Sequence, residues 1–162
     1  ATTHQHNFYL IEQAVSSANY RTLMREHATA EKAFWQDSFS EDSYVWGFGF
    51  GQNALASEDP YLDTLTDHPG NYAHAPTIAG FIGTDITQLE DFLQWIDNDL
   101  ALVTNQLTLE TVPWRFSQER PDLQMSQVEM QGIIPQLMGL ASHPGLLDIS
   151  FFRNNTVYPV AE

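Results

Sequence analysis

The sequence predicts an α+β fold in which a mostly antiparallel sheet packs against a long N-terminal helix and two further helices. Three patterns predict it: helical apolar spacing over residues 7–36, a strand–turn–helix pattern over 77–103, and alternating aromatic side chains over 44–50. A chain of 162 residues, 43% of them hydrophobic, fits one domain that can bury a full core. We therefore expect a single domain over 1–162, with its αβ core at about 44–160.

The chain is strongly acidic, with 21 Asp and Glu residues against 6 Lys and Arg residues and a net charge of −15. Such a surface repels nucleic acid phosphates and anionic lipid headgroups, because both are bound through Lys and Arg. We expect no nucleic-acid partner. The absence of cysteine excludes disulfides, thiolate nucleophiles and Cys-ligated metals. No run of about 18 apolar residues occurs, so we expect membrane contact only through segments outside this chain.

Residues 7–36 contain neither Gly nor Pro and are predicted to form one long helix. A strand over Phe8–Val15 is the alternative. Two apolar lines run along the predicted helix, which is more than one packing face needs, so this helix would also support a homodimer. The first line is Phe8, Ile11, Val15 and Ala18, and the second is Tyr20, Leu23, Met24, His27 and Phe34.

Large aromatic residues alternate with small residues over 44–50, in the order YVWGFGF. This alternation predicts a strand with one large face, and its glycines leave the other face open to a close neighbour. Two interpretations stay open: a sheet face packed under a helix, or one wall of a ligand pocket. The glycines lack the GxGxxG spacing, so we do not expect a nucleotide-binding loop.

Residues 52–76 form the least regular segment and are expected to be a long loop, which in a compact domain is more often functional than not. Pro60 is placed to begin a short helix that would present Asp59, Asp63 and Asp67 on one side. Three carboxylates there would suit a hard cation such as Ca²⁺, although they lack the alternating calcium-loop pattern. A solvated acidic face is the alternative that we favour.

The clearest pattern in the chain runs from Thr77 to Val103. An apolar run around Ile78 predicts a buried strand, and Asp85 and Thr87 are polar residues of the kind that begin helices. The apolar residues at helical spacing are Leu89, Phe92, Leu93, Ile96, Leu100 and Val103. We therefore expect a strand, a tight turn at the glycines and an amphipathic helix laid back on the core.

The last third of the chain predicts further strands and one helix. Residues 106–112 alternate as a strand or extended arm does. Ser126 and Glu129 form a capping box for a helix that continues to Ala141. The pattern over 146–160 predicts two strands joined by a turn.

Six histidines suggest a metal site, but none pairs with another at i, i+4 and no HExxH motif occurs. We expect no preformed metal site. If a metal is bound, Asp67, His68 and His74 are the best candidates, and the alternative is that these are loop histidines bonded to backbone. No GxSxG motif is present, so no catalytic residue is predicted.

Aromatic residues near polar ones give the predicted ligand-binding residues. These are Trp46, Tyr61, Tyr72, Trp114 and Arg115. Arg115 adjoins Trp114 in a chain where basic residues are scarce, and an arginine in an aromatic setting can hold a carboxylate. The alternative is that Arg115 pairs with a surface acid.

Two segments resemble parts of the extracytoplasmic PAS-like (Cache/PDC) sensor domains of bacterial receptors. IAGFIGTDITQLEDFL at 78–93 resembles the strand–turn–helix of that family, and LASHPGLLDISFFRNNTVYPV at 140–160 resembles its helix-end, strand, turn and strand. A long N-terminal helix is also typical of the family. The Tyr/Arg/Trp/Asp ligand signature of amino-acid-sensing members is not visible, so no ligand residue is carried over.

From these observations we expect an extracytoplasmic, periplasmic sensor domain of a bacterial membrane receptor, which binds a small molecule without catalysis and without a cofactor. The cytoplasm is the alternative compartment. Two other functions stay open. One is a small enzyme of unknown reaction that uses segments 44–50 and 52–76. The other is a structural interaction domain of the envelope or pilus type.

Overall fold

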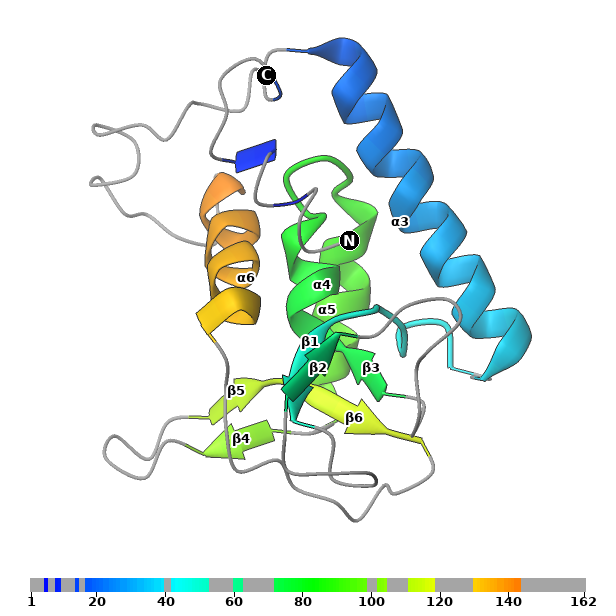
Figure 1. The fold of residues 1–162 in the computed structure, drawn as a ribbon, viewed down its shortest axis with the longest axis vertical. Helices are drawn as coiled ribbons and strands as arrows, with labels where there is room; N and C mark the ends of the chain where they lie inside the picture. The colour runs from blue at the N-terminus through cyan, green and yellow to red at the C-terminus, as the bar shows by residue number, and fades with distance from the viewer. Residues whose placement is uncertain are drawn as a thin grey trace.

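The protein is described by a computed structural model, in which helices gather above short strands (Figure 1). The structure describes residues 5, 8–9, 14, 17–39, 42–52, 60–62, 72–98, 102–104, 111–118 and 130–143. The elements are α3 (Ala18–Ser38), β1 (Phe50–Gln52), β2 (Pro60–Leu62), β3 (Tyr72–His74), α4 (Ala75–Gly80), α5 (Thr87–Asp97), β4 (Leu102–Thr104), β5 (Thr111–Pro113), β6 (Arg115–Ser117) and α6 (Met130–Ser142). The predicted α+β class is confirmed.

All strand pairing in the described residues is antiparallel, but it is divided into three two-stranded ladders instead of the one sheet that we expected. The pairs are β1 with β2, β3 with β6, and β4 with β5. Each strand has only three residues, and isolated two-stranded ladders are marginal in water. Packing against the helices therefore has to stabilise them, and the side chains of the β3–β6 ladder are largely buried.

The long N-terminal helix is shorter than predicted, because a helix start interrupts it at Ser17. Ser17 has an extended backbone and its hydroxyl accepts a hydrogen bond from the Tyr20 backbone N–H, as an N-cap residue does. Helix α3 then runs to Ser38. Phe8, Tyr9 and Ala14 lie in helical backbone, so the strand alternative is wrong at the described positions of that segment.

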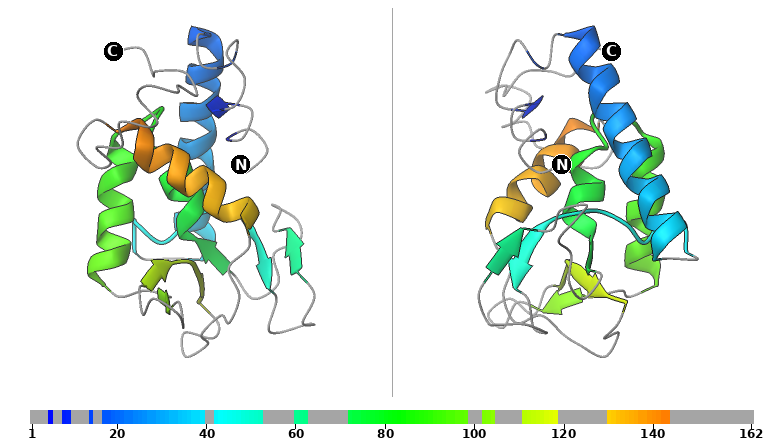
Figure 2. Two further views of the ribbon diagram at one scale, coloured as in Figure 1. Left: turned by 90° about the vertical axis from the view of Figure 1, so that its left-hand side faces the viewer. Right: turned by 45° about the vertical axis from the view of Figure 1, so that its right-hand side comes forward.

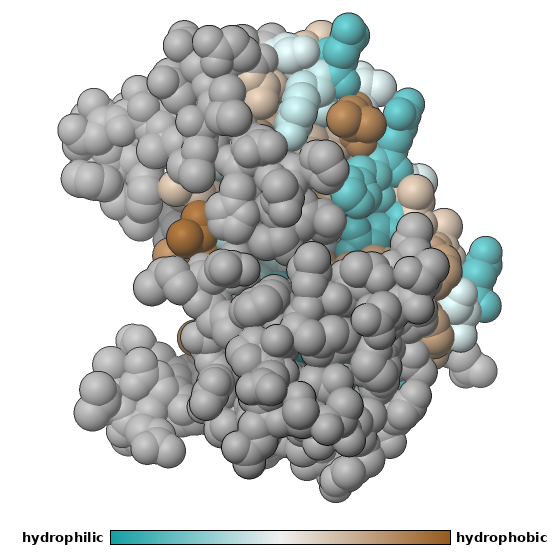
Figure 3. All heavy atoms as spheres, in the orientation of Figure 1, coloured by the Kyte–Doolittle hydropathy of each residue, from teal (hydrophilic) through white to brown (hydrophobic). Residues whose placement is uncertain are grey.

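Helix α3 turns one face to the core. Met24, Ala28 and Trp35 are fully buried there, together with the carboxylate of Glu31. The opposite face is largely hydrophilic (Figure 3), and Leu23 is the one large hydrophobic residue of α3 that is exposed. Most side chains of the second apolar line therefore pack in or against the core of the same molecule.

The strand predicted at the start of 77–103 is wrong, because residues 75–80 form helix α4. Pro76 lies in its first turn, where a missing N–H costs nothing, and His74 caps it with extended backbone. All six residues of α4 are buried. A short run of apolar residues occurs both in buried strands and in buried helices. Periodicity alone therefore could not tell that residues 75–80 form a helix.

The helix predicted after the turn is confirmed as α5, although it ends at Asp97 and Val103 belongs to β4. The helix begins at Thr87, and Asp85, two residues before it, bonds to its first residue. Asp85 Oδ1 accepts hydrogen bonds from the backbone N–H of Thr87 at 3.0 Å and from the Thr87 hydroxyl at 2.8 Å. This carboxylate satisfies donors of the first turn that have no partner inside the helix.

The strand predicted over 44–50 is also wrong, since only Phe50 belongs to a strand. Residues 45–49 are buried, and their backbone does not pair regularly with a strand: the Trp46 carbonyl accepts one hydrogen bond from His74 of β3, and Phe48 bonds to side chains. The Phe48 N–H donates to Glu31 of α3, and its carbonyl accepts from the Thr77 hydroxyl at 2.8 Å. Gly47 has φ +107°, a left-handed conformation that regular strands do not contain.

Several further predictions have mixed outcomes. Pro60 lies in strand β2, so the predicted short helix does not begin there. The helix expected to end at Ala141 is confirmed as α6, and residues 111–112 of the predicted strand lie in β5. The predictions for Asp59, Asp63, Asp67, Ser126, Glu129 and residues 146–160 concern positions outside the described residues. No helix in the described ranges has the length and apolar character needed to cross a bilayer.

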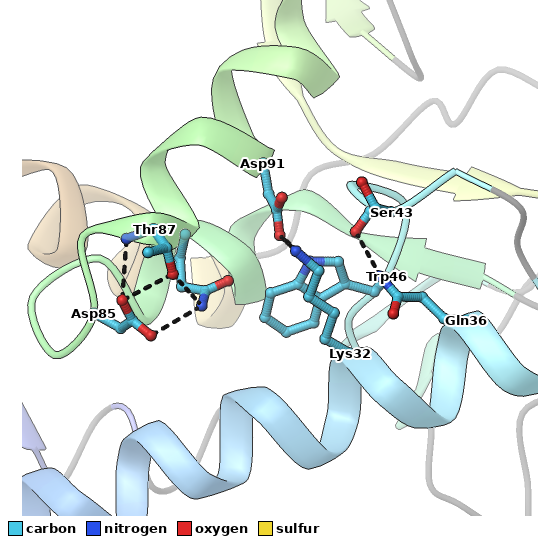
Figure 4. A network of polar contacts seen from close by, with 8 residues as sticks. Lys32, Gln36, Ser43, Trp46, Asp85, Thr87 and Asp91 are labelled. Atoms are coloured by element: carbon cyan, nitrogen blue, oxygen red, sulfur yellow. Dashed lines mark hydrogen bonds and ion pairs between the residues drawn. The ribbon is translucent and has the colours of Figure 1, made fainter.

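One carboxylate connects three parts of the fold (Figure 4). Asp91 of α5 is buried, and its Oδ2 accepts from Lys32 Nζ of α3 at 2.5 Å and from Trp46 Nε1 at 2.8 Å. The Trp46 ring in turn stacks on Phe81, with centroids 6.0 Å apart. Asp91 therefore fixes α3 and the 45–49 segment against α5.

We expect Asp91→Ala to lower the free energy of unfolding by about 1–3 kcal/mol, because the buried Trp46 N–H loses its acceptor and Lys32 loses its ion pair. Urea unfolding followed by circular dichroism measures this. Glu90→Ala is the matched control on the exposed side of the same helix, with an expected change within about 0.5 kcal/mol. Equal effects of the two variants would contradict the role given to Asp91.

Candidate functional site

The predicted ligand-binding residues are divided by the fold. Tyr72, Trp114 and Arg115 come together on and beside the β3–β6 ladder, and all three are fully buried. The indole of Trp46 points away from them to Asp91 of α5. Tyr61 lies in β2, and its side chain is outside what the structure describes.

The ladder sets the positions of these side chains. His74 pairs with Arg115, and Tyr72 pairs with Ser117. The Arg115 guanidinium carbon lies 4.4 Å from the centre of the Tyr72 ring, which is cation–π geometry. Arg115 is thus inside the protein. The alternative, in which it pairs with an acid at the surface, is wrong.

His74 lies at the centre of this group. Its backbone N–H donates to the Trp46 carbonyl at 3.1 Å, and its ring meets the Trp114 ring edge-on with centroids 5.2 Å apart. The next residue, Ala75, donates its N–H to the Trp114 carbonyl at 3.1 Å. The carbonyls of Trp46 and Trp114 therefore fix the backbone at His74 and at the residue after it.

The hydrogen bonds of Thr77 fix the tautomer of His74. The Thr77 hydroxyl has one proton, which it donates to the Phe48 carbonyl at 2.8 Å. His74 Nδ1 lies 2.8 Å from the same hydroxyl oxygen, so Nδ1 carries the proton and donates. In the neutral ring this leaves Nε2 as an unprotonated acceptor.

The electrostatic setting keeps this imidazole neutral. Burial is the largest cause that lowers the His74 pKa well below its ordinary value, and the positive charge of Arg115 lowers the pKa further. His74 is therefore uncharged at neutral pH, with the Nε2 lone pair available.

Two glycines make room for the imidazole. A Cβ on Gly49 would lie 2.2 Å from His74 Cγ, so only glycine lets the chain pass over this ring. A Cβ on Gly132 of α6 would lie 3.2 Å from His74 Cε1 and 2.6 Å from Trp114 Cη2. The predicted close approach at the GFGFG glycines is confirmed at Gly49, and α6 closes the other side.

Three buried polar atoms around this junction have no hydrogen-bond partner among the described residues: His74 Nε2, Trp114 Nε1 and Gln136 Oε1. Gln136 lies one turn beyond Gly132 on the same face of α6, and all three side chains are at most 5% exposed. Each such atom costs about 1–3 kcal/mol when it is left unsatisfied. A small bound molecule with matching polar groups would recover these hydrogen bonds. We call His74, Trp114 and Gln136 the junction site.

The sequence pointed to part of this site. Trp114 was predicted, whereas His74 was considered only as a metal candidate, and Thr77 and Gln136 carried no signal. The alternating glycines before β1 were the one clue that a ring would approach there. The described residues contain no cluster of His, Asp or Glu that could hold a metal ion, and Asp67 and His68 lie outside them.

Comparison of the chain with protein-family models, with characterised proteins and with solved structures found no match in any of the three. The site is therefore interpreted from its own geometry.

We expect His74 to make stability depend on pH. Below about pH 6.5 the unfolded chain takes up a proton on this histidine, whereas the folded chain, with its lowered pKa, does not. The contribution of His74 to the free energy of unfolding is therefore fully present above that pH. It falls by about 1.4 kcal/mol per pH unit as the pH drops towards the pKa of His74 in the folded state. His74→Phe should remove this contribution in urea unfolding at about pH 7.5 and 5.5.

Thr77→Val is the matched control for that experiment. It removes the hydroxyl that orients the ring but keeps the histidine buried, so it should lower stability at both pH values while keeping the wild-type slope. A slope in His74→Phe equal to that of the wild type would contradict a buried neutral imidazole.

Proposed function

We propose that this domain binds a small molecule at the junction site without changing it chemically. The observation that carries the proposal is a set of three buried polar atoms that have no hydrogen-bond partner among the described residues. Two belong to the His74 and Trp114 rings, which Gly132 of α6 approaches, and the third belongs to Gln136, one turn further along α6. Binding sites for small molecules combine apolar and aromatic walls with a few placed polar groups. The junction site offers both kinds of group, since the His74 and Trp114 rings are aromatic and each carries a buried nitrogen without a partner among the described residues.

The tautomer of His74 and the indole N–H of Trp114 define the hydrogen-bonding groups that a ligand would need. His74 Nε2 requires an N–H or O–H donor, and Trp114 Nε1 requires an acceptor. The two rings pack edge-on with their centroids 5.2 Å apart, so the ligand has to be small to reach the polar atoms of both. Small amides, hydroxy acids and amino acids carry a donor and an acceptor within one compact molecule.

A continuous set of hydrogen bonds supports a sensing role. His74 donates to Thr77, Thr77 donates to the Phe48 carbonyl, and the N–H of the same Phe48 donates to Glu31 of α3. A ligand that shifts the imidazole therefore acts on a residue that α3 holds directly. This is the arrangement that a sensor would use to pass ligand binding to its long helix.

We propose further that the domain belongs to a bacterial membrane receptor and works in the periplasm or another extracytoplasmic compartment. The support is the resemblance of 78–93 and 140–160 to PAS-like sensor domains, although α4 takes the place of the strand at the start of the first segment. A homodimer through α3 also stays a proposal, with exposed Leu23 as its apolar contact.

One observation favours the enzyme alternative. A neutral imidazole, oriented through Nδ1 by Thr77 and free at Nε2 of hydrogen bonds to the described residues, has the form of a general base. The two functions differ in the fate of the ligand, which a binding domain releases unchanged. The structural alternative predicts no small-molecule ligand at all.

We expect a panel of small carboxylates, amines, amides and divalent ions to contain a compound that raises the melting temperature. At about 100 times its Kd, a ligand selective for the folded state raises Tm by roughly 5–10 °C for a domain of this size. His74→Phe and Gln136→Leu should lose this shift. Leu137→Ala, an exposed neighbour on α6, is the matched control and should keep it.

Three results would count against the proposal. A shift that survives in His74→Phe would mean that the ligand binds elsewhere. A panel without any shift would favour the structural alternative. Conversion of the bound compound, followed by NMR, would favour the enzyme.

A further inference from the structure

Helix α5 carries apolar side chains that the described residues leave largely exposed, beside Leu89, which packs against the core. Its core face consists of Gln88, Asp91, Phe92 and Trp95, all of them buried. On another side lie Ile86, Leu93 and Ile96, which are 51%, 43% and 37% exposed, and half-buried Leu89 lies between them. The exposed fractions show that this side is accessible, and Figure 2 shows α5 along the outer margin of the molecule in its left-hand view.

The spacing of these residues matches a helix-packing seam. Positions 86, 89, 93 and 96 are separated by three, four and three residues, which is the a/d spacing of a heptad. Ile86 is helical in backbone although it precedes α5, so the seam is continuous. It extends over about 15 Å, enough for a partner helix of about three turns. We call Ile86, Leu89, Leu93 and Ile96 the α5 seam.

The charges beside the α5 seam define its partner. Glu90 lies next to Ile86 and Leu93 on the helix surface, and Asp97 lies next to Leu93; both acids are exposed. Helix α5 contains no Lys or Arg, and the chain as a whole carries −15. A second copy would bring acidic flanks against acidic flanks, which is unfavourable, whereas Lys or Arg at the flanks of a partner helix would be attracted.

We infer that the α5 seam docks a basic amphipathic helix of another protein. Leucine-type residues of the partner would pack on Leu93 and Ile96, and its basic residues would lie against Glu90 and Asp97. This surface is separate from the junction site, so the inference does not depend on the proposed ligand.

The probe is a fluorescent peptide of about three heptads with Leu at a and d and Lys at e and g, and anisotropy measures its binding to the whole chain. We expect binding that weakens as salt rises to about 0.5 M, and at least tenfold weaker binding of the same peptide with Glu in place of Lys. The double variant Leu93→Ser with Ile96→Ser should bind at least tenfold more weakly. Leu137→Ser, equally exposed on α6, should bind as the wild type does.

Circular dichroism melting shows that the variants stay folded, since all the changed residues are exposed. The inference is overturned if the Lys peptide does not bind, if the Glu peptide binds as tightly, or if Leu137→Ser weakens binding as much as the double variant. It is also overturned if sedimentation shows a wild-type dimer that the double variant dissociates, because the seam would then belong to a second copy.

Discussion

The fold depends on the burial of one imidazole. Around His74, the 45–49 segment crosses one ring face at Gly49, α4 holds Nδ1 through Thr77, and α6 approaches at Gly132. The backbone of His74 is bonded at the same time to Trp46. Segments between residues 45 and 132 therefore meet at one side chain, and any larger residue at the two glycines would separate them.

Carboxylates hold the remaining elements to this centre. Glu31 and Asp91 are almost fully buried, whereas Glu26, Asp37, Asp42, Glu90 and Asp97 are exposed. Each has donors that compensate for the loss of water: the Phe48 N–H for Glu31, and Lys32 with the Trp46 indole for Asp91. Buried carboxylates without such donors would be strongly unfavourable, so these contacts restrict α3 to one position against the core.

Two of the errors in the sequence-based predictions share one cause, which is the burial of backbone outside regular strands. The pattern over 44–50 has strand periodicity, yet Gly47 takes a left-handed conformation and the polar groups of Phe48 are satisfied by Glu31 and Thr77. Residues 75–80 look like a buried strand because every side of α4 is covered. In both cases a partner distant in sequence decided the local structure, and a single sequence does not reveal that partner.

Local chemistry in the sequence determined the α+β class, the helix start after Asp85 and the amphipathic character of α5, because capping and helical spacing act between neighbouring residues. The sequence also indicated Tyr72, Trp114 and Arg115 as candidate ligand-binding residues. Only the tertiary structure decided that these residues meet, that Trp46 turns to Asp91 instead, and that His74 and Gln136 join them. The physical reason is that the tautomer of a histidine and the satisfaction of a buried amide depend on long-range hydrogen bonds.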